Sequence, residues 1–184
     1  MNTKNYLYGF VSVAILAFVA ILIYETISPK NSAKSKRIEC QKQSTTFERV
    51  YAPEAIDETI KALKSGNIQT KYKMLFSVHT PTQMGQYFTI EEVNEDLLEI
   101  LSRYEDTTIQ SQKPLVIDYH LYENDINDPG KKSKEAKKYA GYIRMNFYLG
   151  STRVYSNQID FLDFEGKDIK DRLQCAIDSL ITLQ

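Results

Sequence analysis

The sequence lacks the short motifs that mark the commonest enzyme classes. It contains no P-loop pattern (GxxxxGKS or GxxxxGKT), no HExxH, no GxSxG and no GxGxxG. Phosphate-binding loops, zinc proteases and serine hydrolases therefore have no support in the sequence. Internal repeats, proline-rich tracts and glycine- or serine-rich linkers are absent as well. We therefore expect neither a cofactor nor a metal, and an enzyme is the less favoured interpretation.

An excess of positive charge is also missing. The 184 residues include 23 basic and 24 acidic side chains, and from residue 41 onward there are 18 basic and 22 acidic ones, a net charge of −4. Domains that bind nucleic acid need a basic surface, so nucleic acid is not an expected partner. Hydrophobic residues make up 42% of the chain, with 13 tyrosines and 8 phenylalanines, which is typical of a folded domain.

The chain has a single long hydrophobic run, from Leu7 to Tyr24. It carries no charge over 18 residues, and as a helix it would be about 27 Å long, the short end of what spans a bilayer. Tyr6, Tyr8 and Tyr24 lie at its two ends, where membrane helices concentrate aromatic residues. We predict one transmembrane helix, with a membrane anchor over 1–28, a basic juxtamembrane linker over 29–46 and a soluble α+β domain over 47–184.

Two other interpretations of this run remain open. A cleavable signal peptide is the main alternative, although Asn31 and Ala33 match a cleavage site poorly. A pilin-type leader cut after Gly9 would need a glutamate where the chain has Ala14. The uncleaved anchor is the favoured interpretation.

The charges beside this run favour a cytoplasmic domain. Lys4 lies before it, whereas Lys30, Lys34, Lys36 and Arg37 follow it, and basic flanks tend to stay inside. Long domains cross membranes largely regardless of such charges, and a first anchor often enters with its short tail inside. The two cysteines of the chain shift our expectation to an extracytoplasmic domain, with the cytoplasmic orientation as the alternative.

These cysteines, Cys40 and Cys175, lie near opposite ends of the expected domain. Their separation excludes a CxxC redox motif, and two thiols alone do not form a structural zinc site. On a helical wheel Cys175 falls beside the hydrophobic stripe of the last helix, where another segment could pass over it. We predict a Cys40–Cys175 disulfide, with two unrelated free thiols as the alternative.

Hydrophobic periodicity predicts seven elements in the order α, β, α, β, β, β, α. Thr89 and Glu92 form a capping box at the start of the second helix. The expected helices cover 53–66, 91–104 and 167–184, and the expected strands cover 67–80, 114–125, 139–150 and 153–164. The fold class is α+β, an N-terminal transmembrane helix followed by a two-layer sandwich of about four mostly antiparallel strands with two to three helices on one face. This order resembles that of small envelope-assembly accessory proteins.

Period-two alternation assigns the side chains of the strands to two faces. One set is hydrophobic and is expected to pack against the helices: Ile117, Tyr119, Leu121, Ile143, Met145, Phe147 and Leu149. The opposite set is the candidate partner-binding face: His79, Asp118, His120, Tyr122, Tyr142, Arg144 and Tyr148. Tyrosine and arginine are enriched where protein interfaces concentrate their energy, although tyrosine pairs also stabilise a solvated sheet that has no partner.

The sequence contains three weaker signals of function. His79, His120 and Asp118 could serve a small-ligand or enzymatic site, which is the alternative function. A lysine-rich loop could contact anionic lipid or an acidic partner, or simply keep the loop soluble: Lys131, Lys132, Lys134, Lys137 and Lys138. The segment DINDPG begins like a calcium loop but lacks two of the ligands, so a plain turn is expected.

Together these patterns predict a membrane-anchored, extracytoplasmic, non-enzymatic module that binds a protein partner in the envelope.

Overall fold

The computed structural model describes residues 38–130, 134 and 137–183 of the chain. All the elements lie in one compact unit, Ser35–Gln184. In chain order they are α2 (Glu39–Ser44), β1 (Thr45–Val50), the 3-10 turn η1 (Pro53–Ala55), α3 (Ile56–Lys64), β2 (Ile68–Leu75), the 3-10 turn η2 (Met84–Gln86), α4 (Ile90–Ser102), β3 (Leu115–Glu123), β4 (Gly141–Leu149), β5 (Thr152–Phe161) and α5 (Ile169–Ile181).

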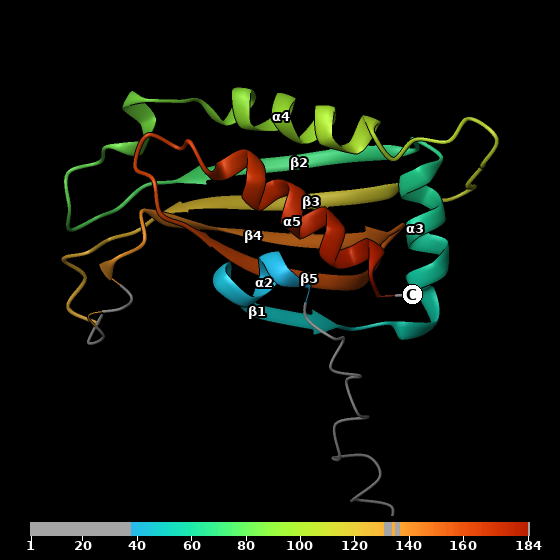
Figure 1. Ribbon diagram of the computed structural model, residues 1–184, viewed down its shortest axis with the longest axis horizontal. Helices are drawn as coiled ribbons and strands as arrows, with labels where there is room; N and C mark the ends of the chain where they lie inside the picture. The colour runs from blue at the N-terminus through green and yellow to red at the C-terminus, as the bar shows by residue number, and fades with distance from the viewer. Residues whose placement is uncertain (1–37, 131–133, 135–136, 184) are drawn as a thin grey trace, which may run out of the picture. The chain divides into compact units, whose positions relative to one another are not determined.

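The strands form one mixed sheet in the order β1-β5-β4-β3-β2. β3, β4 and β5 are an antiparallel meander, and β1 pairs antiparallel with β5. β2 runs parallel to β3 because α4 carries the chain back across the sheet between them. The helices contact the same side of the sheet, with α5 over β4 and β5 and α4 beside β2 (Figure 1). The α+β class and the helix-covered face are therefore as predicted.

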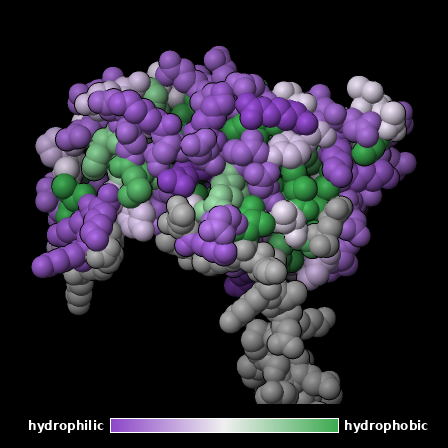
Figure 2. Space-filling model, viewed as in Figure 1, coloured by the Kyte–Doolittle hydropathy of each residue, from purple (hydrophilic) through white to green (hydrophobic). Residues whose placement is uncertain are grey.

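The core lies between the sheet and the helices. Buried and partly exposed residues alternate along β3 and β4, and the residues predicted to face the helices are the buried ones. Ile60, Leu97 and Leu173 close the core from three different helices. Seen from the helix side, the surface is mostly hydrophilic, with smaller hydrophobic areas between (Figure 2).

The sheet has five strands and not about four. β1 is not predicted from the sequence because TTFERV has too few hydrophobic residues to show a strand period. α2 is not predicted either, because it is a helix of only 6 residues. Both elements overlap the predicted linker 29–46, so residues 39–46 belong to the fold and not to a linker. The predicted transmembrane helix Leu7–Tyr24 lies outside the described residues, and no helix within them is long and hydrophobic enough to cross a membrane.

The predicted disulfide is present. Cys40 of α2 is bonded to Cys175 of α5, with the two Cα atoms 5.9 Å apart. Tyr155 of β5 donates a hydrogen bond to Glu48 of β1, and Gln41 of α2 donates another to the same carboxylate. These contacts attach the first two elements of the fold to its last strand and helix.

Candidate functional site

The side of the sheet away from the helices carries six of the seven residues predicted for the partner-binding face. Strand pairing sets Tyr122 opposite Tyr142 and His120 opposite Arg144. The two tyrosine rings stack at a centroid distance of 4.5 Å. The pKa of Tyr142 is raised above its ordinary value, mainly by burial and to a smaller extent by the neighbouring Tyr122. Its hydroxyl is therefore protonated at neutral pH. Their role in binding remains a prediction.

This open face is basic although the unit as a whole is acidic. We define the open face by Tyr51, which follows β1 and contacts Arg49 and Arg153, and by the residues whose side chains the strand register places there: Phe47, Arg49, Gln69, Lys71, Lys73, Leu75, Val116, Asp118, His120, Tyr122, Tyr142, Arg144, Asn146, Tyr148, Arg153, Ser156, Gln158 and Asp160. Five lysines and arginines stand against two aspartates in this set, whereas the chain from residue 41 carries a net charge of −4. The surplus of acidic residues therefore lies elsewhere, including the exposed side of α4.

One corner of the open face is built from arginines stacked on a tyrosine. The guanidinium of Arg153 lies 3.9 Å from the ring centroid of Tyr51, and that of Arg49 lies 4.9 Å from it. Tyr148 is paired with Arg153 across β4 and β5. Such cation–π contacts hold the arginine planes in place while their N–H groups remain available to acceptors.

The centre of the open face is held by polar side chains that bond to one another. Ser156 donates to the Asn146 side chain at 2.7 Å, and Asn146 donates to the carbonyl of Asp118 at 3.4 Å. His120 lies 3.6 Å from the Asp118 carboxylate. These contacts restrict the side chains before any partner binds, which lowers the entropy cost of binding.

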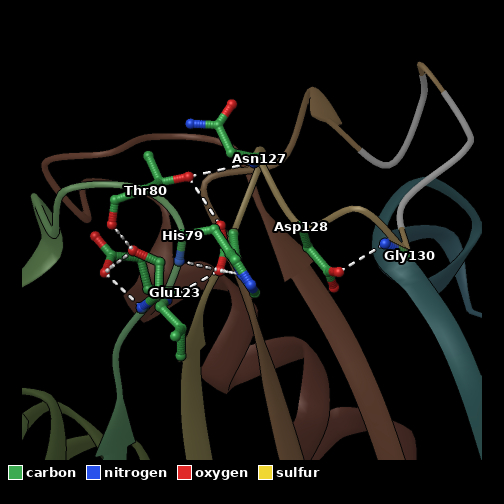
Figure 3. Close-up of polar contacts among 9 residues, drawn as sticks. His79, Thr80, Glu123, Asn127, Asp128 and Gly130 are labelled. Carbon is green, nitrogen blue, oxygen red and sulfur yellow. Dashed lines mark hydrogen bonds and ion pairs between the residues drawn. The ribbon is translucent and has the colours of Figure 1, made fainter.

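His79 does not lie on the open face, so this part of the prediction was wrong. β2 ends at Leu75, and the chain then leaves the sheet in a loop. The His79 Nδ1 atom lies 2.8 Å from Asp125, and the backbone N–H of His79 donates to the same carboxylate (Figure 3). The strand was predicted too long because alternation continues through Phe76 and Val78, which point outward in the loop, both substantially exposed.

Two carboxylates at the end of β3 hold this loop, residues 76–84. Glu123, only 9% exposed, accepts hydrogen bonds from the backbone N–H groups of Ser77, Gln83 and Met84 and from the Thr82 hydroxyl. Burial alone would raise the pKa of Glu123, but these donors outweigh it and lower the pKa to about 2. This role of Glu123 is not among the predictions, although an acidic residue in the inward register of a strand indicates a buried hydrogen-bonding partner.

Asp125 repeats the arrangement two residues further on. It accepts hydrogen bonds from the N–H groups of Val78 and His79 and from the Thr80 hydroxyl. Burial opposes ionisation, but these donors hold the pKa of Asp125 well below its usual range. Asp128 accepts from the N–H of Gly130 in a turn (Figure 3). The two aspartates of DINDPG thus hold the backbone of nearby loops by hydrogen bonds.

The three residues of the alternative enzymatic site are not brought together. His79 pairs with Asp125 beyond the end of β3, whereas His120 and Asp118 lie inside that strand. The strand from 120 to 123 alone spans about 10 Å. Within the part of the chain that the structure describes, no group of three histidine, cysteine, aspartate or glutamate side chains is placed to hold a metal ion.

The lysine-rich loop is described only in part. Lys134, Lys137 and Lys138 are exposed. Lys131 and Lys132 lie outside the described residues, so the predicted contact with lipid or an acidic partner remains a prediction.

Comparison of the chain with protein-family models, with curated proteins and with solved structures finds no match.

Proposed function

We propose that this chain is a membrane-anchored, non-enzymatic module that binds an acidic protein surface through the open face. The observation that carries the proposal is the uncovered side of the five-stranded sheet, where basic and aromatic side chains gather on an otherwise acidic unit. Protein interfaces are rich in tyrosine and arginine, and complementary charge steers partners together. Tyr142, Tyr148 and Arg144 are its central contacts.

The proposed location is outside the cytoplasm, with Leu7–Tyr24 as the anchor. The Cys40–Cys175 disulfide supports this orientation, because such bonds persist in oxidising compartments and are rare in the cytosol. The lysines and arginine at 30–37 favour the opposite orientation. An alkaline phosphatase fused after Gln184 should be active, and activity of a cytoplasmic reporter at the same position would overturn the orientation.

Site-directed photo-crosslinking of the full chain in its native membranes tests the docking face. A photoreactive residue in place of Tyr148 should give a specific crosslinked protein. The same residue in place of Glu95, which is exposed on α4, is the matched control and should give none. Crosslinking from Glu95 but not from Tyr148 would place the interface on the helices and overturn the proposal.

A charge reversal then tests the chemistry of the partner. Arg144→Glu should strongly reduce the crosslink formed from position 148, because it places an acidic group opposite an acidic surface. Glu95→Lys should leave that crosslink unchanged. An undiminished crosslink in a folded Arg144→Glu protein would contradict an acidic partner.

A further inference from the structure

The two edges of the sheet differ in how well they are protected from further pairing. β1, at one edge, has 6 residues, a shift of register between Thr45 and Phe47, and a charged residue, Glu48, turned toward the core. Bulges, short length and inward charges are the devices by which proteins block an edge strand. β2, at the other edge, has 8 residues paired with β3 in an unbroken register.

The outward hydrogen-bonding groups of β2 can be identified from its pairing. Leu115 of β3 donates its N–H to the carbonyl of Asn67, so the polar groups of Asn67 point toward β3. Backbone groups alternate in direction along a strand. The N–H groups of Thr70, Tyr72 and Met74 therefore point to the open edge, and no strand in the described ranges pairs with them.

Two exposed hydrophobic side chains, Tyr72 and Leu98, lie on the helix side of this edge. The ring of Tyr72 packs 5.9 Å from that of Tyr119, yet Tyr72 remains 39% exposed. On α4, Asp96 and Glu99 bind Lys170 of α5, so they mark the side of α4 that faces α5.

Leu98 falls on the opposite flank of α4, the flank toward the outer edge of β2, and is 47% exposed. A strand added beside β2 would cover both hydrophobic side chains.

The charges on the other side of the edge define what such a strand must carry. Lys71 and Lys73 are exposed on the open face, and neither forms an ion pair with any residue in the described ranges. Pairing with β2 of a second copy would bring these lysines close to their equivalents, which is unfavourable. An acidic strand would instead neutralise them.

We propose that β2 is a β-augmentation site for an extended peptide segment of a partner protein, one that alternates acidic with hydrophobic residues. Its backbone would pair with Thr70, Tyr72 and Met74, its hydrophobic side chains would contact Tyr72 and Leu98, and its acidic side chains would lie beside Lys71 and Lys73. Eight strand residues give a contact about 26 Å long. The site shares only Lys71 and Lys73 with the open face. Its backbone contacts lie at the edge of β2, two strands away from Tyr142 and Arg144 of β4, so each proposal can fail while the other holds.

Binding of a synthetic peptide to the purified full chain in mild detergent tests this site. The probe has eight residues that alternate glutamate with valine, and the control peptide has lysine in place of glutamate. Fluorescence anisotropy should detect the acidic peptide at micromolar to submillimolar concentration and at least tenfold weaker binding of the basic one. Equal binding of the two peptides, or none by either at millimolar concentration, overturns the proposal.

A pair of substitutions at one position tests the backbone contact. Thr70→Pro removes an outward N–H without removing a bond to β3, whereas Thr70→Ala keeps that N–H and removes the same side chain. The proline variant should bind the acidic peptide at least tenfold more weakly, and the alanine variant should bind normally. Binding that is the same in both variants overturns the pairing.

A second measurement tests the same backbone contact on the wild-type chain, so it does not require the Thr70→Pro variant to fold. N-methylation of alternate amides of the probe should abolish binding for one set of positions and spare it for the other, because a strand pairs through alternate residues. Equal effects of both sets would show attachment by charge alone and overturn strand addition.

Discussion

The Tyr122 and Tyr142 rings stack on each other at 4.5 Å on the face of the sheet that no described helix covers. The pair lies at directly opposed positions of β3 and β4, where side chains on one face are closest. Both rings remain partly exposed, so each offers a flat hydrophobic surface with a hydroxyl at its rim. Tyrosine is enriched at protein interfaces because it combines such a ring with a polar end.

Loss of one ring should separate the stabilising role of the pair from its binding role. We expect Tyr142→Ala to lower the free energy of unfolding by about 1 kcal/mol, which a thermal melt would register as a few degrees. Combined with Arg144→Ala, it should weaken partner capture by about 2 kcal/mol or more. A folded double variant that captures its partner normally would count against docking on this face.

The disulfide should be the largest single contribution to stability. It closes a loop across 135 positions of sequence, for which the chain-entropy model gives about 5 kcal/mol. Urea unfolding of Cys175→Ala should therefore require much less denaturant than that of the wild type. Cys40→Ala and the double variant should match the single variant, because each removes the same bond. If the losses of unfolding free energy in the two single variants instead added up in the double variant, the two cysteines would stabilise the fold separately and not through one bond.

Alternation along β3 and β4 predicted the faces of the sheet because it is a local consequence of strand geometry. Ile117 and Phe147 are buried, and Asp118 and Asn146 are not, as the pattern indicates. The capping box of Thr89 was also predictable, since both partners lie within one helical turn.

The features that the sequence did not predict depend on contacts between residues far apart in the chain. The loop that contains His79 is held by Asp125, 46 residues away, so the sequence around His79 could not show where β2 ends. β1 is a strand because β5 supplies its hydrogen-bonding partners, and its own sequence gives a weak strand signal. Glu123 was visible as an inward acid, but the loop that satisfies it could not be identified from the sequence.

A glycine at the start of β4 lies where a side chain cannot fit. A Cβ atom on Gly141 would lie 2.2 Å from the carbonyl oxygen of Tyr122 and 2.3 Å from the Phe161 ring. We expect Gly141→Ala to cost about 3 kcal/mol, because one of these groups must move. Gly130→Ala is the control, since the atoms nearest to its Cβ would be those of the Asp128 side chain, which can shift, and thermal melts should show little change. A Gly141→Ala protein as stable as the wild type would contradict this packing.

The stability that Glu123 provides through its hydrogen bonds to the 76–84 loop should depend on pH. The pKa of Glu123 is lowered from 4.5 to about 2, so its carboxylate stabilises the fold fully above pH 5 and loses this contribution as pH falls toward 2. We expect Glu123→Gln to cost on the order of 2 to 3 kcal/mol at pH 7, because an amide leaves backbone donors unpaired.

The difference in unfolding free energy between wild type and Glu123→Gln should shrink as pH falls from 5 to 2, which urea titrations at several pH values would measure. Hydrogen exchange at the amides of Ser77, Gln83 and Met84 should accelerate in the variant, since these three donate to the carboxylate. Glu95→Gln, exposed on α4, should change neither quantity. A difference independent of pH would mean that Glu123 acts by packing alone, and would contradict the role of its charge.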